Sequence, residues 1–430
     1  MPKKNIFIVG SDEFNQKELK TIDRAHKYEF IPLLQKEEAN PKNDKPDIEA
    51  LLDKARERLD NFEGNIDGII CFFDFPATLL SFILIQEYQL HGPSLESGLK
   101  CEHKYWSRIE QQKVTPDHVP DFAAVNPFEV KNIEDIAVSP PFWLKPVKAY
   151  GSQIGFKIDS QHELDEALPV IRENIGFFGE PFNYILSKAG LPDSISKIDG
   201  HHCIAESLIG GHQCTLSGYV HGDTVEIYGI VDSINYEDTD SFFYYLLPSG
   251  LPDDVQENMI EVTKRIIRSI GFKDAPFNIE FFYEKEKNNF YVLEINPRMS
   301  QSHSDLYNKV TGHSNHQVAV HLAQGMHPDF DMNHRQAKFG AKMHYRVFED
   351  GIITNYPGDN ELQQVKEKYP DVYFFPMASE GDRLSELERQ DSYSYKLFAI
   401  YLGADSKEQL MDKYDDILEI LNLKIEKIDA

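Results

Sequence analysis

The sequence predicts a mixed α/β protein in which a parallel sheet comes first and antiparallel hairpins follow. Three observations support this class. Strand and helix patterns alternate through the first hundred residues, short apolar runs separated by turn signals follow from about residue 203, and a polar turn divides the segment 277–298 into two strand-like halves. The sequence shows no internal repeat, low-complexity tract or long flexible linker, so we expect subdomains of one enzyme-sized body.

Length and charge narrow the classes of function. The chain has 430 residues, with 44 Lys and Arg against 71 Asp and Glu, which gives a formal net charge of −27. At roughly 100–200 residues per domain, two or three structural units are expected. Proteins that bind nucleic acids or anionic membranes neutralise phosphates with clustered basic residues, so the acidic excess argues against both kinds of partner.

Cysteine usage and the apolar runs indicate a cytoplasmic protein. Four cysteines without CxxC spacing are too few for a disulfide framework in a chain of this length, so we expect reduced thiols. The apolar run at 6–9 ends at Gly10, which is too short for a signal peptide. The longest apolar stretch, 77–85, falls far below the ~20 residues of a membrane-spanning helix.

The first hundred residues have the pattern of strand–helix units. A buried strand is expected at 5–9 and a polar helix at 14–26. A second strand at 66–73 leads through Asp74-Phe75-Pro76 into a helix at 77–90, with Pro at its start. Parallel sheets of this kind place ligand-binding loops at the carboxyl ends of their strands. Neither GxGxxG nor a Walker P-loop occurs, so dinucleotide binding has no motif support.

A second block occupies residues 140–211. A short strand is expected at 142–147, a Gly-Ser loop at 148–153, and another strand at 203–208. Lys145 ends the first strand beside the loop, which is the chemistry needed to neutralise and cover phosphates. The alternative is a lysine that is simply solvated at a strand end.

Two further charged residues, Glu206 and Lys104, indicate a function only when they are considered together with the other segments. Glu206 closes the second strand before Gly210-Gly211, where a strand edge can present backbone groups to a purine. The alternative there is an ordinary edge strand protected by a charged side chain. Lys104 lies on an expected helix and by itself indicates nothing.

The rest of the chain, from Gln213 onward, is rich in hairpin patterns and closes with a helix. Strands at 214–220 and 225–231 flank a His-Gly-Asp turn. Ser406 and Gln409 have the spacing of a capping box, so the last helix is expected to begin at Ser406.

The most informative segment is the acidic hairpin at 277–298, FNIEFFYEKEKNNFYVLEINPR. If it closes symmetrically about Lys287, Glu280 opposes Glu294 and Asn278 opposes Asn296. Side chains two residues apart share a face of a strand, so all four polar groups project from one side. The opposite, apolar face would then carry Ile279, Phe281, Tyr283, Tyr291, Leu293 and Ile295.

Opposed carboxylates in this hairpin predict a cation between them. Two such groups would lie about 4.5–5.5 Å apart and repel each other. A pair of Mg²⁺ ions fits, because these ions take carboxylate and amide oxygens and are often completed by substrate phosphates. Arg298 follows at once and could hold a phosphate or carboxylate. An exposed polar face with Lys or Arg as counter-charge is the alternative, and a slip of one residue would destroy the arrangement.

In this order and spacing, these segments resemble the ATP-grasp superfamily, specifically its carboxylate–amine ligases, which include L-amino-acid (dipeptide) ligases, and more distantly biotin carboxylase. The resemblance spans nearly the whole chain. It implies an ATP-grasp fold with a Rossmann-like N-terminal domain at 1–120, a lid subdomain at 135–211, and a C-terminal subdomain at 212–430 with the metal and substrate site. The matching positions are Lys104, Lys145-Pro146, Gly151-Ser152, Glu206, Gly210-Gly211, Glu280 and Glu294-Ile295-Asn296-Pro297-Arg298.

The resemblance also implies how ATP would be bound. Lys104 and Lys145 would contact its phosphates, and the loop that contains Ser152 would close over them as a lid. Glu206 would accept a hydrogen bond from the adenine amino group, and Leu208 would supply backbone contacts.

For the metal and the ribose, the resemblance implies further roles. Glu280, Glu294 and Asn296 would bind two Mg²⁺ (or Mn²⁺) ions that bridge the ATP phosphates, and Arg298 would stabilise the acyl phosphate and the tetrahedral intermediate. Where relatives often carry a Glu that binds the ribose hydroxyls, this chain has Gln213. An amide can still hydrogen-bond a diol, so we expect an altered ribose contact and retained ATP binding.

Substrate identity is expected to depend on the segments 299–305 and 308–316. His303 is a candidate contact for a substrate carboxylate or a general base, and a loop histidine with satisfied hydrogen bonds is the alternative. A zinc site formed by His303, His313 and His316 is disfavoured, because no HxxxH motif or Cys partner accompanies them.

The function that the resemblance implies is an ATP-dependent ligase that joins a small-molecule acid to an amine through an acyl phosphate, with an amino acid as one substrate. ADP and phosphate would be the other products, and a homodimer would be in keeping with related ligases. Two alternatives stay open. One is a carboxylase of the biotin-carboxylase or purine-biosynthesis type that uses bicarbonate. The other is a nucleotide-binding regulator without turnover, against which the joint presence of the acidic residues and Arg298 argues.

Overall fold

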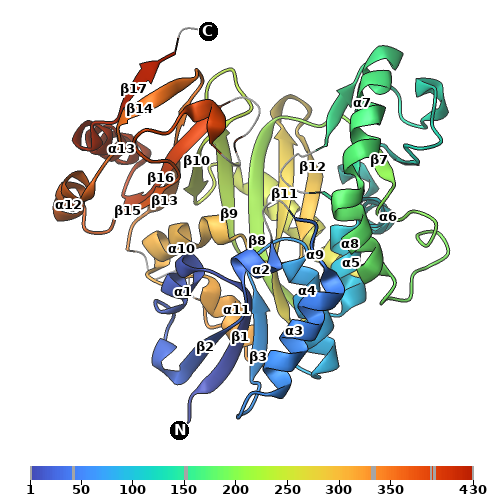
Figure 1. Ribbon diagram of the computed structural model, residues 1–430, viewed down its shortest axis with the longest axis horizontal. Coiled ribbons are helices and arrows are strands. Elements are labelled where there is room, and N and C mark those ends of the chain that lie inside the picture. Colours follow the sequence, from blue (N-terminus) through green and yellow to red (C-terminus); the bar gives the residue numbers. More distant parts are fainter. Residues whose placement is uncertain are drawn as a thin grey trace.

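The computed structural model describes residues 2–40, 44–149, 154–330, 336–387, 390 and 394–428. Figure 1 shows the N-terminal strands at one end of a large central sheet, with the segment around α7 on one side and the C-terminal strands and helices on the other. None of the helices in the described ranges combines the length and the apolar character that crossing a bilayer requires.

The N-terminal part forms the predicted parallel sheet. Its strand order is β2 (Tyr28–Gln35), β1 (Lys4–Ser11), β3 (Gly68–Cys71), and both pairings are parallel. No strand was expected at β2, which carries Pro32. Proline is tolerated there because β2 is an edge strand of this sheet. The helices around this sheet are α1 (Glu13–Leu19), α2 (Lys36–Ala39), α3 (Ile48–Asp60) and α4 (Ala77–Glu87).

The helix predicted at 14–26 is shorter than expected, and that prediction was wrong in its length. Helix α1 ends at Leu19, and a separate 3₁₀ turn covers Ala25–Lys27. The Thr21 hydroxyl donates a hydrogen bond to the carbonyl oxygen of Glu18 at 2.8 Å. Such side-chain bonds compete with the helical pattern, which accounts for an early end.

A small antiparallel sheet confirms the two strands predicted in the second block. Its order is β4 (Phe122–Val125), β7 (Cys203–Ser207), β5 (Phe142–Pro146), β6 (Phe156–Ile158). Trp143 on β5 directly opposes Glu206 on β7. Because Lys145 shares the face of Trp143, its side chain lies diagonally from that of Glu206. The helices of this region are α5 (Leu95–Glu102), α6 (Lys104–Val114), α7 (Gln161–Asn174) and α8 (Gly176–Leu186).

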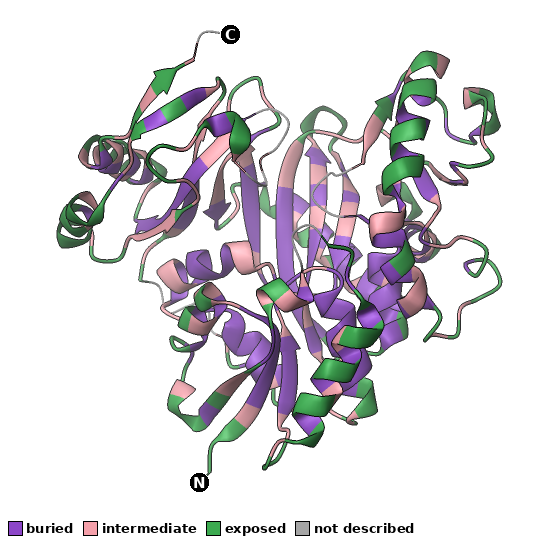
Figure 2. Cartoon of the chain, viewed as in Figure 1, coloured by how far each residue is buried: buried purple, intermediate pink, exposed green. Residues whose placement is uncertain are grey.

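The large sheet has eight strands, and every neighbouring pair is antiparallel. Its order is β12 (Asn289–Asn296), β11 (Ala275–Glu284), β8 (His212–His221), β9 (Thr224–Asn235), β10 (Phe242–Leu247), β13 (Phe339–Val347), β16 (Tyr395–Ala404), β15 (Tyr373–Pro376). The predicted hairpin of β8 and β9 is confirmed, with Gly222 at φ 58° in its turn, a conformation that favours glycine. Figure 2 shows that the middle strands of this sheet are mostly buried.

Helices cover both faces of the large sheet. One face packs against α9 (Asp253–Ile270), α12 (Asp359–Lys368) and α13 (Lys407–Leu421), through apolar clusters that include Leu216 and Met343. The opposite face, called the front face below, packs against α10 (Ser304–Thr311), and α11 (His316–Leu322) follows it. A two-stranded sheet of β14 (Gly351–Asn355) and β17 (Lys424–Lys427) lies beside them. The last helix, α13, begins as predicted, because the Ser406 hydroxyl accepts from the backbone N–H of Gln409 at 3.2 Å.

The predicted register of the acidic hairpin is confirmed at Asn278 and Glu280, but it is wrong between Glu280 and the turn. Glu280 opposes Glu294 and Asn278 opposes Asn296, as expected. A bulge then shifts the pairing, so that Phe281 opposes Val292. The extra residue reverses the alternation along β12. Phe290 and Val292 are therefore buried, and the predicted apolar-face residues Tyr291 and Leu293 are only partly buried.

Candidate active site

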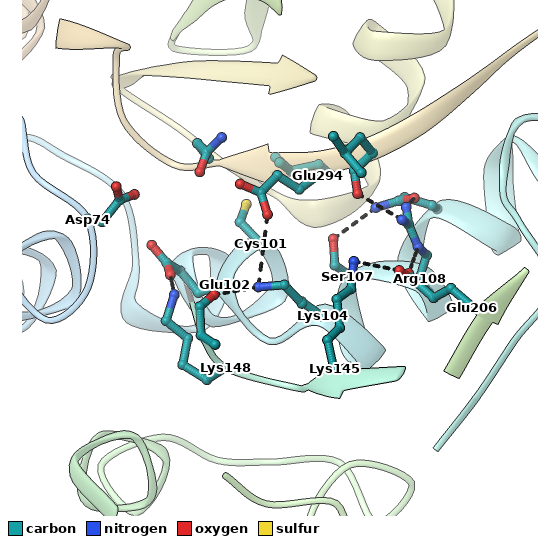
Figure 3. A pocket seen from close by; sticks show the side chains of 15 residues that line it. Asp74, Cys101, Glu102, Lys104, Ser107, Arg108, Lys145, Lys148, Glu206 and Glu294 are labelled. Atoms are coloured by element: carbon teal, nitrogen blue, oxygen red, sulfur yellow. Dashed lines mark hydrogen bonds and ion pairs between the residues drawn. The ribbon is translucent and has the colours of Figure 1, made fainter. Parts of the chain in front are cut away.

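Five of the predicted site residues line one pocket between α6, the end of β5 and β12 (Figure 3). Three different parts of the fold contribute its charged side chains. The predicted members are Lys104, Lys145, Glu206, Glu294 and Asn296. The predicted lid residue Ser152 and its neighbours 150–153 lie outside the described residues.

Lys104 is the first residue of α6 and points into this pocket (Figure 3). Its ammonium donates to the carbonyl oxygen of Ala149 at 2.8 Å and lies 3.9 Å from the Glu294 carboxylate. Burial lowers the pKa of Lys104 to about 8, although Glu294 favours the charged form. Nearby, Lys148 and Glu102 form a fully buried ion pair that the sequence did not suggest. The pocket wall thus presents several ammonium groups suited to an anionic ligand.

Glu206 is buried between two cations. Its Oε1 accepts from Arg108 Nε and its Oε2 lies against Lys145 Nζ, both at 2.6 Å. Burial alone would raise the pKa of Glu206, but the two cations outweigh it and hold that pKa at about 2. The hydrogen bond expected from an adenine amino group to Glu206 therefore stays a prediction. It requires the adenine to share the Glu206 carboxylate with Lys145 and Arg108. The backbone contacts predicted for Leu208 also stay a prediction; this residue is 40% exposed.

Arg108 is a site residue that the sequence analysis missed. Besides Glu206, it donates to Gln111 Oε1 at 2.7 Å and to the carbonyl oxygens of Val292 and Leu293, both at 2.8 Å. These carbonyls lie at the bulge next to Glu294, so one guanidinium connects β7 to β12. One signal was available: Arg108 is four residues after Lys104, a spacing that places both on the same face of a helix.

The opposed carboxylates Glu280 and Glu294 form the predicted acidic pair. Burial and the neighbouring Glu294 raise the pKa of Glu280 to about 7, and Arg298 offsets this only in part. The Asn296 amide donates to Glu280 Oε1 at 3.3 Å and to Asn278 Oδ1 at 3.0 Å. Two opposed carboxylates and the amide oxygen of Asn296 are hard oxygen ligands, so the residues present fit a divalent metal ion.

Within the described ranges, no group of three or more His, Cys, Asp or Glu side chains is placed to hold a metal ion. The two glutamates and Asn296 thus supply a partial set of hard ligands, of the kind that substrate phosphates and water complete. Gln213, predicted to contact ribose, donates to Glu280 Oε2 at 3.1 Å. In this structure its amide therefore supports the acidic pair, and its contact with ribose stays a prediction.

Arg298 is held by a residue from the N-terminal sheet. Its Nε and Nη2 donate to Asp74 Oδ1 at 2.7 and 2.5 Å, and its Nη1 donates to the Met299 carbonyl at 3.1 Å. Asp74 lies just after β3, at the carboxyl end of a parallel strand, where ligand-binding loops were expected. Its pairing with Arg298 was not predicted, because 224 residues separate the two in the sequence.

The three histidines after Arg298 differ in their surroundings. Both ring nitrogens of His316 have partners, Ser314 Oγ and Asn15 Oδ1, each at 2.8 Å, so His316 is a structural residue. His303 is buried, its Nδ1 has no hydrogen-bond partner, and burial lowers its pKa to about 3. His303 is thus not the satisfied loop histidine of the alternative interpretation, and its predicted contact with substrate stays a prediction.

Comparison with known proteins agrees with this geometry. A family model described as an ATP-grasp domain matches residues 138–304, a segment that contains Lys145, Glu206, the acidic pair and Arg298. This part of the chain is an ATP-grasp domain. A shorter segment of 75 residues is 40% identical to the carbamoyl phosphate synthase large chain of Rubrobacter xylanophilus. That segment is 17% of this chain and 7% of the relative, and the chain spans less than a fifth of each curated relative compared.

Solved structures share the fold over the whole chain. The L-amino acid ligase from Bacillus licheniformis superposes with a TM-score of 0.69 at 17% identity, over 100% of both chains. The biotin carboxylase domain of 2-oxoglutarate carboxylase from Hydrogenobacter thermophilus, a dimer solved with MgADP and bicarbonate, superposes with a TM-score of 0.62 at 15% identity, over 100% of this chain and 92% of that one. The ATP-grasp fold expected for this chain is therefore confirmed, with its parallel N-terminal sheet and antiparallel sheets.

Proposed function

We propose that this chain is an ATP-dependent carboxylate–amine ligase that forms an amide through an acyl phosphate, with an amino acid as one substrate. The observation that carries the proposal is the acidic pair Glu280 and Glu294 near Arg298, with Glu294 lining a pocket that also contains Lys104, Lys145 and Lys148. Metal-binding carboxylates, phosphate-binding cations and an arginine for the acyl group are the parts that this chemistry needs.

ATP phosphates would bind at the lysine side of the pocket. Lys104 is already desolvated and 3.9 Å from Glu294, so phosphate oxygens placed there would meet both a cation and the metal ligands. Lys145 would exchange part of its contact with Glu206 for a phosphate, while Arg108 keeps the glutamate in place. The loop at 150–153 remains our proposal for the lid.

Glu280, Glu294 and Asn296 are the residues that would hold Mg²⁺ or Mn²⁺. Such ions would neutralise the phosphate oxygens during phosphoryl transfer. The chain's own contribution is to place the two carboxylates opposite each other and to orient Glu280 through Gln213 and Asn296. With the ions bound, both glutamates would be ionised, because a bound cation favours the charged form of a carboxylate.

The reaction then proceeds in two transfers. A carboxylate oxygen of the acid attacks the γ-phosphorus of ATP, the bond to the β-phosphate oxygen breaks, and ADP leaves. An amine nitrogen next attacks the acyl carbon of the acyl phosphate, loses a proton, and expels phosphate as the amide forms. Arg298, oriented by Asp74, would stabilise the negative charge on the acyl oxygen. No protein nucleophile takes part.

We further propose the division of the chain into a domain at 1–120, a lid subdomain at 135–211 and a catalytic subdomain at 212–430. Strand β4 of the small sheet lies in the interval between the first two units. A cytoplasmic location and a homodimeric state complete the proposal; the dimer is supported by the dimeric state of one structural neighbour.

The test is ADP release from MgATP with pooled L-amino acids, read together with mass spectrometry of the mixture. We expect ADP and a new amide mass that both require an acid and an amine. ADP release that depends on bicarbonate, without an amide, would support the carboxylase, a reading favoured by the neighbour that contains bicarbonate. Tight ATP binding with no turnover on any acid would contradict the ligase and support a regulator.

A further inference from the structure

A row of side chains runs across the front face of the large sheet, from Gln213 next to the acidic pair to Lys342 on β13. Gln213 on β8 directly opposes Ser233 on β9, Ser233 opposes Tyr245 on β10, and Tyr245 opposes Lys342 on β13. Directly opposed residues project from the same face of a sheet. Lys342 therefore shares a face with Gln213, three strands away, which is about 14 Å along the sheet.

A cluster of basic side chains surrounds the end of this row. His344 lies two residues after Lys342 on β13, so both project from the front face. His303, at the end of the 3₁₀ turn before α10, approaches from above that face. The Tyr245 ring contacts both histidine rings, with centroids 4.9 Å from His303 and 5.0 Å from His344. The Lys342 ammonium lies 5.0 Å from the centre of the Tyr401 ring and 6.0 Å from that of Tyr245.

These basic groups are buried without hydrogen-bond partners. The exposed fractions are 2% for His344, 3% for His303 and 9% for Lys342. Both ring nitrogens of His344 and the Nδ1 of His303 lack a partner. Within the described part of the chain, Lys342 has aromatic contacts but neither a hydrogen bond nor an ion pair. Buried polar groups are normally paired, and each exception calls for an explanation.

In the described part of the chain, the charged groups that act on Lys342 and the two histidines are mostly cations. Asp305 is the carboxylate that acts on Lys342, and it forms an ion pair with Lys309 at 3.2 Å. Lys396 and Arg346 add positive charge near His344. Burial, followed by Lys396, lowers the pKa of Lys342 to about 7. An anion at this position would accept hydrogen bonds from the unpartnered groups and restore the charge on the lysine.

We propose that Lys342, His344 and His303 form an anion subsite for a second acidic group of the acid substrate, remote from the carboxylate that is activated between Glu280 and Arg298. This inference rests on the proposed ligase function. It defines the acid substrate as an extended dianion, which carries either a second carboxylate or a phosphoryl group. Its oxygens would accept from the lysine ammonium and the imidazole N–H groups, and its chain would lie along the front face beside Ser233 and Tyr245.

Equilibrium binding to the full chain tests the subsite without turnover. Isothermal titration, with and without Mg²⁺ and the non-hydrolysable analogue AMP-PNP, would compare adipate, sebacate and dodecanedioate with hexanoate, decanoate and dodecanoate. These pairs match in carbon number and differ in the second carboxylate. A further arm uses 10-phosphonodecanoate, in which a phosphonate replaces the second carboxylate. We expect at least one dianion to bind 10-fold or more tightly than its monoanionic match.

The variant Lys342→Met should reduce that preference to less than about 2-fold, whereas Lys342→Arg should keep part of it. Lys424→Met, an exposed lysine on β17, is the matched control and should bind like the wild type. AMP-PNP affinity should be the same in all variants, which shows that they are folded. Equal binding of dianions and monoanions by the wild type, or an unchanged preference in Lys342→Met, would overturn the subsite. A preserved dianion preference with no amide formed from any acid would refute the ligase and leave the subsite standing.

Discussion

Two charged regions, the nucleotide pocket and the proposed anion subsite, differ in how their charges are paired. In the nucleotide pocket, Glu206 is held by Arg108 and Lys145, and Arg298 is held by Asp74. In the proposed anion subsite on the front face of the large sheet, Lys342 and the two histidines have no partner of opposite charge in the described structure. Glu206 and Arg298 are thus paired by protein groups, whereas the basic groups of the anion subsite are not.

This difference shows what buried charge can do in a binding site. Paired charges keep a fixed geometry before the ligand arrives, so little reorganisation is needed when ATP binds. Unpaired charges raise the free energy of the empty protein, and a ligand that supplies the missing charge recovers that energy. Variants at the two regions should therefore change stability in opposite directions.

The largest effect is expected from Arg108→Met. Removing one partner of a buried charge pair typically costs about 3–5 kcal/mol, and here the carbonyls at the β12 bulge also lose their donor. Urea unfolding should show this loss. Lys113→Met is the control, since Lys113 is 57% exposed and its bond to Glu110 should contribute less than about 1 kcal/mol. A loss of under 1 kcal/mol for Arg108→Met would show that the pairing is dispensable.

Glu294→Ala should leave stability almost unchanged and reduce ADP formation by roughly 10²–10³-fold, the scale seen when one electrostatic contact to a transition state is removed. Glu294 is 40% exposed on its side chain, so its loss leaves no buried cavity. Glu286→Ala, in the exposed turn of the same hairpin, is the matched control. Full activity in Glu294→Ala would refute the metal assignment.

Lys342→Met should make the free protein more stable, by about 2 kcal/mol at pH 7, the opposite sign to Arg108→Met. Burial lowers the pKa of Lys342 to about 7 from 10.5, so folding opposes its charged form. Wild-type stability is therefore lost as the pH falls from 10.5 toward 7, and the gain in the variant should fade above pH 10. Guanidinium unfolding at pH 7 and pH 10 measures this, and destabilisation at pH 7 would contradict it.

Glu18→Gln should give the smallest effect, about 1 kcal/mol, at the edge of the second region. Burial and Asp305 raise the pKa of Glu18 to about 7 from 4.5, so the folded state holds a proton that the unfolded chain releases. Wild-type stability should fall as the pH rises from 4.5 through 7, and the variant should lack this slope. Unfolding at pH 5 and pH 8 compares them; parallel profiles would mean that Glu18 is ionised at neutral pH in the fold.

Local patterns in the sequence were enough to predict the acidic pair of the site and the start of one helix. The alternation of side chains and the polar turn at Lys287 predicted that Glu280 opposes Glu294, and this is confirmed. The spacing of Ser406 and Gln409 predicted the start of the last helix. Each of these depends on groups within one hairpin or one helical turn, where the period of the backbone sets the geometry.

Other features were decided only by the tertiary structure. The bulge in β12 reversed the face of Tyr291 and Leu293, and the carbonyl groups at this bulge accept hydrogen bonds from Arg108, which lies on α6. The pairing of Arg298 with Asp74 joins residues 224 positions apart.

The sequence by itself therefore determined the acidic hairpin, the strand–helix order and the residue types of the nucleotide pocket. The order of strands in the large sheet decided the rest, since it placed Lys342 on the same face as the acidic pair and left it without a counter-charge. Strand order and helix packing are set by burial of apolar surface over the whole chain, and no local spacing carries that information.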